Sequence, residues 1–496
     1  MSDTNLKGEQ SPDQPVPPFT VFSPARKKAI ALQTAFSATF SGLSSFIYYP
    51  AIRPLAEDLD VSVATINLTV SAYLIVAGIF PSIIGDISDQ SGRRVASLLA
   101  FTLYFSANLG IALQDSYAAL VVLRCLQSAG SSGTIAISYG VIADITTPAE
   151  RGSYVGIVLE FTNAAPCLGP VIGGIIVQEL SWRWIFWLLV MLSGLHLLGL
   201  VMFFPETSRK LVGNGSLRPR SRLNRTLWSF RRAPKDQENL KESLGEVTGR
   251  MHLPNPFVCL RLLLNRPTFI IISVGSIQYA IFSALGTSLA TQMATVYSLD
   301  YFEAGLIYLP AGIGGLLAAV STGKLLDRDY RVISRGLSRG PPSSEGLRLH
   351  APNDLLSFPI EKARLRSIFP FLCIASTATI GYGWALHTQI HIAVPLVLQF
   401  LTGATQVAMF VMCGTLLTDF NPDRSANAQS SYNLVRCALA AGLVTALEPI
   451  AHKIGTGWYF TVYGMIGLFC APLLVVLRIW GWQWRRARAE RSEVTS

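Results

Sequence analysis

Charged residues are scarce in this chain of 496 residues. Asp, Glu, Lys and Arg make up 14% of it, whereas a soluble domain has about 25%. Acidic residues are the rarer sign, with 30 Asp and Glu against 40 Lys and Arg. Half of the residues are hydrophobic, and the mean hydropathy is +0.41. Such a composition excludes an ordinary soluble domain and indicates a membrane protein.

The chain also lacks the residue patterns of metal sites, disulfide frameworks and enzymes. Its seven cysteines are scattered, mostly inside apolar stretches, without metal or disulfide spacing. No glycine-rich nucleotide loop is present, so ATP-driven transport has no support. No Ser/His/Asp order lies outside the apolar stretches. We therefore expect no metal, no cofactor and no catalytic residue, and we do not expect an enzyme.

Long apolar runs are what the chain has instead. Runs near 20 residues match the length that crosses about 30 Å of hydrocarbon as a helix. We predict an all-α polytopic membrane protein with twelve transmembrane helices in two six-helix halves. The predicted spans are 29–52, 64–84, 95–113, 118–143, 153–177, 184–204, 268–293, 303–323, 366–386, 391–417, 428–448 and 457–480.

The distribution of positive charge predicts the orientation of these spans. Residues 205–266 carry 13 Lys and Arg against 5 Asp and Glu, and the tail after Trp484 begins Arg-Arg-Ala-Arg. Connections on the other side, such as Gln114 to Ser116, are nearly free of positive charge. By the positive-inside rule, both termini and the central loop are cytoplasmic. The net charge of +10 is then a topology signal, and we expect no nucleic-acid partner.

These boundaries divide the chain into five parts. They are a cytoplasmic tail over 1–28, a six-helix half over 29–204, a cytoplasmic central loop over 205–267, a second six-helix half over 268–480 and a cytoplasmic tail over 481–496. The second half contains a further cytoplasmic insert over 325–365, which we expect to be mobile. Residues 255–266 are apolar enough for an interfacial helix. Two parallel halves place a binding site near the midplane between them.

A charged segment after the second span recurs after the eighth. The first copy is Gly85-x-x-x-Asp89-x-x-Gly92-Arg93-Arg94, and we expect its two glycines to allow a tight hairpin. The second copy begins 238 positions later with Gly323, Asp327 and Arg328, followed by Arg331. In both copies a Gly precedes an Asp by four residues and an Arg by eight. Matching places in two halves indicate a duplicated transporter.

The first charged segment resembles the signature between spans 2 and 3 of the major facilitator superfamily. Further segments fit that resemblance in order: Pro50-Ala51-Ile52-Arg53-Pro54, Arg124-Cys125-Leu126-Gln127, and Gly169-Pro170-Val171-Ile172-Gly173-Gly174, the last similar to the motif of proton-driven exporters. Three more are similar to the fungal twelve-span drug:proton antiporters, in particular the quinidine-resistance-like pumps: Phe204-Pro205-Glu206-Thr207, Phe358-Pro359-Ile360-Glu361 and Asn433-Leu434-Val435-Arg436. The resemblance covers about residues 25–480.

The resemblance implies the major facilitator fold and a role for the charged segments. In that family the loop between spans 2 and 3 latches the two halves in the outward-facing state. The gate residues here would be Gly85, Asp89, Gly92, Arg93 and Arg94. The second copy lacks the second glycine and the double arginine, so we interpret it as a worn counterpart. The alternative is a solvated loop whose charges only set the topology.

Glu160 is the most suggestive residue of the fifth span. It lies about 10 Å into the bilayer from Ser153, where a carboxylate is costly and marks a functional candidate. Gly169 and Gly173 lie about 180° and 220° around the helix from it. Their face can pack closely on a neighbour, so Glu160 would face a cavity, where burial raises a carboxyl pKa. The alternative is a permanently hydrogen-bonded carboxyl.

Arg124 and Arg436 are the candidate cations within the spans. Arg124 lies about 9 Å from the outer face, about 11 Å from the depth of Glu160, so we expect no direct ion pair. We expect Arg124 to contact Gln127 one turn away, backbone carbonyls or a cavity. The resemblance assigns it to proton coupling, and the alternative is a structural hydrogen bonder. Arg436 matches the depth of Glu160, and the two can meet across a cavity.

Together these features predict a proton-coupled efflux antiporter. Its partners would be protons, the lipid bilayer and an amphipathic drug or secondary metabolite, and we expect a monomer. Tyr73, Tyr139, Tyr279 and Phe282 are candidate cavity residues. The plasma membrane is the favoured location, with the vacuolar membrane as the alternative. Two other functions stay open: uptake or export of a defined solute (an organic acid, polyamine or sugar), and a non-transporting receptor of the same fold.

Overall fold

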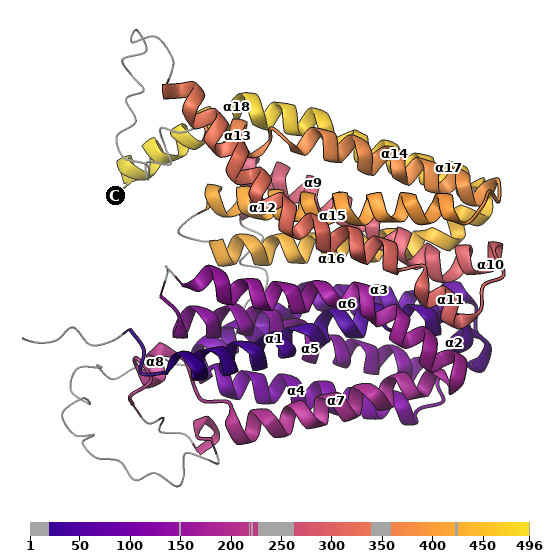
Figure 1. Ribbon diagram of the computed structural model, residues 1–496, viewed down its shortest axis with the longest axis horizontal. Helices are drawn as coiled ribbons and strands as arrows, with labels where there is room; N and C mark the ends of the chain where they lie inside the picture. The colour runs from indigo at the N-terminus through magenta and orange to yellow at the C-terminus, as the bar shows by residue number, and fades with distance from the viewer. Residues whose placement is uncertain are drawn as a thin grey trace, which may run out of the picture.

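The protein consists of two helical bundles that lie side by side (Figure 1). The computed structural model describes residues 19–147, 150–217, 219, 222–226, 262–338, 359–421 and 425–495, and every regular element within these ranges is helical. Twelve helical segments are long and apolar enough to cross a membrane. The predicted fold class is therefore confirmed.

The N-terminal half holds the first six spans. Its first span is broken: α1 is followed by a short 3-10 turn and α2. Its elements are α1 (Pro24–Phe46), η1 (Tyr49–Ala51), α2 (Ile52–Asp58), α3 (Val63–Ser91), α4 (Arg93–Leu113), α5 (Tyr117–Ile145), α6 (Arg151–Glu179) and α7 (Trp182–Phe203), with the short α8 (Arg209–Val212) and η2 (Arg222–Asn224) after them.

The C-terminal half holds the other six. Its first span changes from α-helix to a π-turn and back before the chain reverses at the short α11. Its elements are α9 (Arg266–Ser288), η5 (Leu289–Met293), α10 (Ala294–Val296), α11 (Tyr301–Leu306), α12 (Leu309–Ser338), α13 (Ile360–Arg364), α14 (Ile368–His387), α15 (Ala393–Phe420), α16 (Ser425–Ile454), α17 (Thr456–Leu468) and α18 (Cys470–Thr495).

Local sequence signals explain where several helices begin. The side chain of Ser23 accepts a hydrogen bond from the backbone of Arg26 at the start of α1, and Ser62 caps α3 in the same way. Asp300 and Glu303 form a reciprocal capping box on α11. Such caps satisfy backbone N–H groups that have no partner within the helix. They fix the places where the chain turns at the bundle ends.

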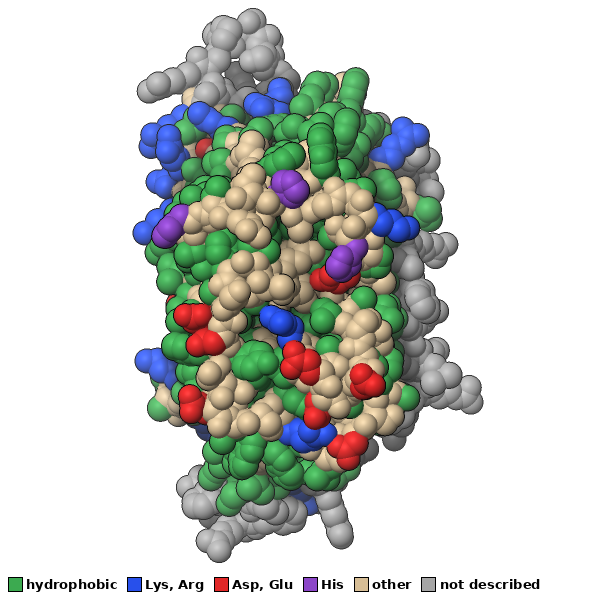
Figure 2. Space-filling model, turned by 90° about the vertical axis from the view of Figure 1, so that its right-hand side faces the viewer, with side chains coloured by type: hydrophobic (Ala, Val, Ile, Leu, Met, Phe, Trp, Pro, Cys, Tyr) green, Lys and Arg blue, Asp and Glu red, His purple; other side chains and the backbone are tan. Residues whose placement is uncertain are grey.

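We call the end that carries the chain termini the inner end, and the opposite end the outer end. Figure 1 shows the inner end on the left, with α8 and α13, and the outer end on the right, with α2 and α10. Figure 2 shows the outer face, where Asp and Glu side chains gather mainly over the N-terminal half and His side chains over the C-terminal half. Arg183 links this acidic region together through ion pairs with Asp58 and Asp115.

The predicted hairpin is present only as a tight turn at Gly92, and the second charged segment forms no hairpin. Gly85 and Asp89 lie inside α3, and the chain turns only at Gly92, whose φ of 105° favours glycine. Gly323 lies inside α12, which continues without a break to Ser338. An apolar run ends where the hydrocarbon ends, but charged residues sustain a helix beyond that point. The spans were therefore predicted, and the helix ends were not.

Part of the predicted cytoplasmic insert is regular structure. Residues 325–338 continue α12, α13 precedes the ninth span, and residues 339–358 lie outside the described residues. Most of the central loop also lies outside them, including residues 255–261 of the predicted interfacial helix. Residues 262–264 form a short helical turn before α9.

The two halves meet from mid-depth to the outer end. Among the described residues, the hydrogen bonds between the halves join α3 to α16 and α6 to α11. On α3 they involve Ser71, Ala77 and Gly78, and on α6 they involve Gln178. Further inward, a methyl group added at Gly85 or Gly323 would meet no atom within 4 Å. The halves are thus bound to each other at the outer side.

Candidate functional site

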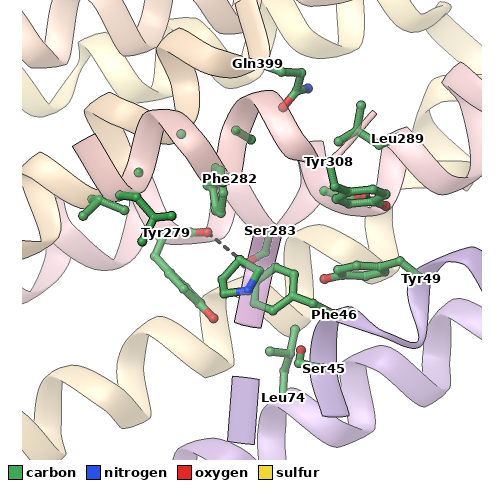
Figure 3. Close-up of a pocket in the computed structure, with 18 residues that line it drawn as sticks. Ser45, Phe46, Tyr49, Leu74, Tyr279, Phe282, Ser283, Leu289, Tyr308 and Gln399 are labelled. Atoms are coloured by element: carbon green, nitrogen blue, oxygen red, sulfur yellow. Dashed lines mark hydrogen bonds between the residues drawn. The ribbon is translucent and has the colours of Figure 1, made fainter. Parts of the chain in front are cut away.

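A cavity lies between the two halves, on the inner side of their outer contacts (Figure 3). Elements of both halves contribute to it: α1, η1, α3 and α6 from one, and α9, η5, α12 and α15 from the other. Its lining residues include five aromatic side chains and no Asp, Glu, Lys, Arg or His. The aromatic ones are Phe46, Tyr49, Tyr279, Phe282 and Tyr308; Ser45, Ser283 and Gln399 supply polar groups.

Two stacked tyrosines connect the halves across this cavity. The rings of Tyr49 and Tyr308 lie parallel, with an interplanar angle of 5° and centroids 5.6 Å apart. The hydroxyl of Tyr308 donates to the carbonyl oxygen of Gly286 at 2.5 Å. Offset stacking of this kind adds to the energy of burial. The cavity thus has a flat aromatic wall and few polar contacts.

Two of the four predicted cavity residues line it. Tyr279 and Phe282 belong to its lining. Tyr73 instead lies inside the N-terminal half, where its hydroxyl is bonded to Ser131, and Tyr139 is 38% exposed on α5. All four were chosen for polar-aromatic placement in a span, and a span does not reveal which neighbour a side chain meets.

Arg124 is enclosed within the N-terminal half and does not line the cavity. Its guanidinium carbon lies 4.0 Å from the ring centroid of Tyr48 and 4.4 Å from that of Tyr73. Its Nη1 donates to Gln127 Oε1 at 2.5 Å and to the carbonyl oxygen of Ser44 at 3.3 Å. Cation–π contacts and one amide thus hold a buried cation, without an acidic partner among the described contacts. The expected neighbours Arg124 and Gln127 are in contact.

Glu160 is exposed on the stripe of α6 that faces the C-terminal half. At 100° per residue, Cys167 and Gly174 lie within about 40° of it around the helix. Both meet the other half: Gly312 lies against Cys167, and the backbone of α11 lies against Gly174. Glu160 is two turns closer to the inner end. No described hydrogen bond or ion pair joins it to Arg124 or Arg436.

The glycine-rich segment of α6 packs on two neighbours. A methyl group added at Gly169 would lie 3.1 Å from the backbone nitrogen of Ile47, and one at Gly173 would collide with the carbonyl oxygen of the same residue. Gly174 faces the backbone of Tyr301 in α11, and the carbonyl of Pro170 faces Gly305. Small residues here allow helix backbones to approach closely. The segment therefore joins α6 both to its own half and to the outer contact between halves.

Arg436 lies beside the cavity on α16. Its guanidinium carbon is 4.6 Å from the ring centroid of Tyr279, which lines the cavity, and 5.1 Å from that of Phe410. Its Nε and Nη2 donate to Asn433 Oδ1 at 3.1 and 2.8 Å. The amide nitrogen of Asn433 donates in turn to the carbonyl oxygen of Ala77, at 2.9 Å, in the other half.

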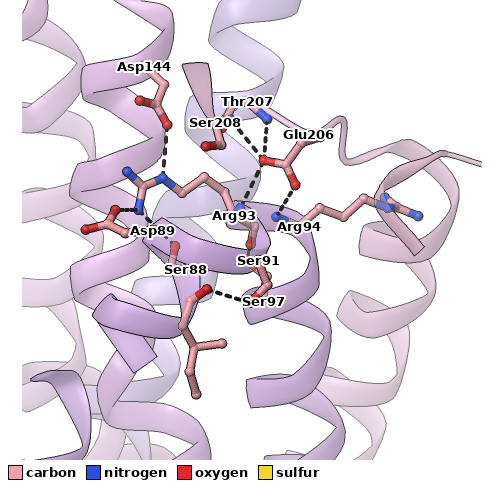
Figure 4. Close-up of polar contacts among 11 residues, drawn as sticks. Ser88, Asp89, Ser91, Arg93, Arg94, Ser97, Asp144, Glu206, Thr207 and Ser208 are labelled. Carbon is pink, nitrogen blue, oxygen red and sulfur yellow. Dashed lines mark hydrogen bonds and ion pairs between the residues drawn. The ribbon is translucent and has the colours of Figure 1, made fainter. Parts of the chain in front are cut away.

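The first charged segment forms an ion-pair network at the inner end (Figure 4). Arg93 Nε donates to Asp144 Oδ2 at 3.0 Å, and Arg93 Nη1 lies 2.6 Å from Asp89 Oδ1. Nη1 also donates to Ser88 Oγ at 3.0 Å. This network joins the ends of α3, α4 and α5 within one half. The described contacts of Asp89 and Arg93 include none to the other half.

Glu206 completes this network, and sequence reasoning did not assign it a role. Its Oε1 accepts from the backbone nitrogens of Arg93, Thr207 and Ser208 at 2.9 Å each, and its Oε2 accepts from that of Arg94 at 3.1 Å. A carboxylate at a helix N-terminus is favoured by the unpaired N–H groups and the helix dipole. Glu206, which follows α7, thus caps α4.

Arg94 makes the reverse contact. Its guanidinium donates to carbonyl oxygens at the C-terminal end of α7: those of Leu200 at 2.5 Å, of Val201 at 2.7 Å and of Phe204, which follows the helix. A cation at a helix C-terminus is favoured for the same electrostatic reason. The two charges therefore cap each other's helices. The sequence contains a signal for this arrangement: Arg94 lies at the start of one helix, and Glu206 follows the end of another.

The second copy of the charged segment makes fewer contacts. Asp327 and Arg328 are exposed on α12, and Arg331 Nε donates only to the backbone of Asp327, at 3.2 Å, among the described contacts. The ion pair at the end of α15 is formed instead by Arg364 of α13, whose Nε lies 3.0 Å from Asp419 Oδ2. In this half, α13 therefore provides the ion pair that holds the inner end of α15.

Glu361 of α13 forms the most buried ion pair of that end. Its carboxylate is about 1% exposed, and Arg485 Nη2 donates to its Oε2 at 3.2 Å. Burial raises the pKa of the Glu361 carboxyl, and the Arg485 guanidinium opposes that shift. Asp329, within α12, accepts a hydrogen bond from Ser367, the residue before α14. These contacts fix α13 against α18 and the start of α14 against α12.

Other charged residues have the contacts of structural groups. Glu150 forms an ion pair with Lys27 at 2.6 Å. The ring of His196 is hydrogen-bonded to Ser37 Oγ at 2.7 Å, as expected of a core histidine. Within the part of the chain that the structure describes, no three His, Cys, Asp or Glu side chains are grouped to hold a metal ion.

Known proteins resemble this chain along nearly its whole length. Residues 34–445 match the profile of the Major Facilitator Superfamily. The MFS-type transporter phiD of a fungal strain is 39% identical, over 99% of this chain and 75% of that protein. The MFS-type transporter tstD of Talaromyces stipitatus is 37% identical, over 99% and 88%. Citrate exporter 1 of Aspergillus niger is 34% identical, over 96% and 90%.

Solved structures share the fold at low identity. The crystal structure of a D-xylose-proton symporter superposes with a TM-score of 0.64 at 15% identity, covering 90% of this chain and 97% of that one. The human organic anion transporter MFSD10 superposes with a TM-score of 0.53 at 15% identity, over 91% and 100%.

Proposed function

Because this chain belongs to the major facilitator superfamily, we propose that it exports an amphipathic organic compound in exchange for protons. The protein is a multi-pass membrane transporter and not an enzyme. The observation that carries the proposal is the cavity between the halves, with five aromatic residues and no charged residue in its lining. Such a cavity suits a compound with an apolar body and few polar groups.

Alternating access gives the outer contacts a role as a gate. The stacked Tyr49 and Tyr308 and the glycine face of α6 close the cavity toward the outer end. Export requires that these contacts separate while the halves approach each other at the inner end. The network of Asp89 and Arg93, which now lies within one half, would then latch the inner end as the family resemblance implies. The worn second copy would contribute less.

Proton exchange requires a group that gains and loses a proton during the cycle. Glu160 is a carboxyl within a span, on the stripe of α6 that faces the other half. In this conformation it is exposed, and closure of the inner end would enclose it between the halves. Arg124, which is hydrogen-bonded to Gln127, and Arg436 are the cations that would respond to a change in the charge of Glu160. This assignment makes Glu160 the coupling residue.

The proposal includes an orientation and a location. The positive charge of the central loop and the C-terminal tail supports cytoplasmic termini. With the inner end in the cytoplasm, the cavity receives its compound from the cell interior. We propose the plasma membrane as the site of export and the monomer as the working unit.

Export of a small organic acid is the second candidate. It is favoured by the relative that is named citrate exporter 1 and by two arginines, Arg124 and Arg436, that have no carboxylate partner among the described contacts. A small hydrophilic acid would leave the aromatic lining without a partner, which is why the amphipathic compound comes first.

Accumulation in cells tests the proposal. A panel of labelled amphipathic compounds and citrate would be supplied to cells with and without the protein, each with and without a proton uncoupler. Lower accumulation of an amphipathic compound, abolished by the uncoupler, is the expected result. Higher accumulation on expression would contradict export, and an effect on citrate alone would favour the second candidate.

Glu160→Gln tests the coupling assignment. The substitution keeps the size of the side chain and removes its titration. We expect export driven by a proton gradient to fall at least about tenfold, while downhill exchange of labelled for unlabelled compound continues. Glu179→Gln, at the exposed outer end of the same helix, is the matched control. Unchanged proton-driven export by the Glu160 variant would rule out the assignment.

A further inference from the structure

Arg436 carries a positive charge in the middle of the membrane region, and its described contacts include no carboxylate. An unpaired cation at this depth is costly and marks a functional position. Arg124 differs, because it is 1% exposed and enclosed by Tyr48 and Tyr73. Arg436 keeps part of its surface accessible. Of the two cations, it is therefore the one that a bound molecule can reach.

The surroundings of Arg436 hold its guanidinium in one orientation. Asn433 Oδ1 accepts from Nε and Nη2, and the rings of Tyr279 and Phe410 lie against the guanidinium. Asn433 is itself fixed by its bond to the carbonyl oxygen of Ala77. Cys437 also forms a side-chain hydrogen bond with the guanidinium. A guanidinium has five N–H donors in a rigid plane, so these contacts do not use all of its donors.

Arg436 does not belong to the cavity lining, but it contacts a residue that does. Tyr279 contacts the guanidinium with its ring and also belongs to the cavity lining, as Figure 3 shows for the same residue beside Phe282 and Ser283. The rest of the lining is apolar, aromatic or uncharged polar. A molecule whose body contacts these aromatic surfaces would meet a positive group where it extends past Tyr279 toward α16.

We propose that Arg436 binds the carboxylate of an amphipathic organic acid whose apolar body occupies the cavity. This inference rests on the proposed export function, and it names the chemical class of the exported compound. A planar guanidinium matches a carboxylate better than an ammonium does, since it can donate two parallel hydrogen bonds. The carboxylate also gives Arg436 a partner of opposite charge, so burying the pair costs less free energy than burying the cation alone.

Binding to the purified protein in lipid nanodiscs tests this inference without any gradient. The probes are dansylaminoundecanoic acid and its primary amide, which differ only in charge and one hydrogen-bonding group. Dansyl fluorescence would report both affinities. We expect the acid to bind at least about tenfold more tightly than the amide, the range of one charge-assisted hydrogen bond. Equal affinities for the acid and the amide would overturn the inference.

Variants locate the effect. Arg436→Gln should abolish the preference for the acid and leave the affinity for the amide within about twofold. Arg436→Lys, which keeps the charge but not the planar fork, should retain part of the preference. Arg183→Gln, at the outer surface, is the control and should retain all of it. A full preference in the Arg436→Gln protein would contradict the assignment; if that variant does not fold, the wild-type comparison and Arg436→Lys decide.

Export assays separate this inference from the proposed function. Selective binding of the acid without any export would contradict the proposed function and leave the inference standing. Equal export of the acid and the amide, with equal affinities, would contradict the inference and leave export standing.

Discussion

At the inner end, each half holds the equivalent helix in place with an arginine, but the two arginines come from different segments. Asp144 and Asp419 are each the second-last residue of their helices, α5 and α15, and each accepts from an arginine Nε at 3.0 Å. In the N-terminal half that arginine is Arg93, from the charged segment itself. In the C-terminal half it is Arg364, which follows the insert after α12. Arg331, which matches Arg93 in the repeat, bonds only to its own helix.

This difference shows how a duplicated segment can keep its sequence spacing and lose its contact. In the first copy Gly92 breaks the helix, so Arg93 begins α4 and can reach α5. In the second copy Tyr330 stands at the position that matches Gly92, α12 continues to Ser338, and Arg331 stays on the surface of that helix. The contact to Asp419 then comes from α13. One glycine therefore decides which arginine is available.

The caps differ as well. Glu206 accepts four backbone N–H groups in the N-terminal half, whereas Glu361 of the other half pairs with the side chain of Arg485. The first arrangement joins two helix ends, α4 and α7, through complementary charges. The second joins a short helix to the C-terminal helix α18. Loss of either should destabilise its own half.

Glu206→Gln should have the largest effect on stability. It removes the charge from an acceptor of four buried N–H groups, and we expect a loss on the order of 3 kcal/mol. Thermal unfolding in detergent should show a clearly lower Tm. Glu179→Gln, an exposed glutamate of the same half, is the control and should change Tm little. Equal Tm values for the two variants would show that the cap of α4 is unimportant.

Arg93→Gln and Arg364→Gln should have similar effects, intermediate in size. Each removes a partly buried ion pair with an aspartate at the end of a span, so we expect a loss of about 1–3 kcal/mol. Double-mutant cycles with Asp144→Asn and Asp419→Asn should give comparable coupling energies. Coupling between Arg331 and Asp419 in place of Arg364 and Asp419 would contradict the exchange of arginines that the structure shows.

Asp327→Asn and Arg331→Gln should have the smallest effects. Both residues are exposed, and surface substitutions of this kind usually change stability by less than about 0.5 kcal/mol. Export should also stay within about twofold of wild type, whereas Asp89→Asn should reduce it further if the first copy is the latch. A larger loss of export in Asp327→Asn than in Asp89→Asn would contradict the interpretation of the second copy as worn.

The spans and the family were predictable because apolar runs and ordered motifs are local in sequence. The contact of Arg124 with Gln127 was predictable for the same reason, since residues three apart share a helix face. The roles of Glu206 and Arg364 were not, because they depend on which helices pack at the inner end. Helical phase likewise places Glu160 opposite Gly169 and Gly173, but only the packing of α6 on α11 and α12 shows that it faces the other half.

Transport in inside-out membrane vesicles tests the central claim most directly. Vesicles with an acidic interior would receive labelled dansylaminoundecanoic acid, with the protein oriented so that its inner end faces the medium. Proton-coupled export predicts that the compound accumulates inside against its gradient, and that an uncoupler abolishes this accumulation. Equal accumulation with and without the pH gradient, or in vesicles that lack the protein, would contradict it.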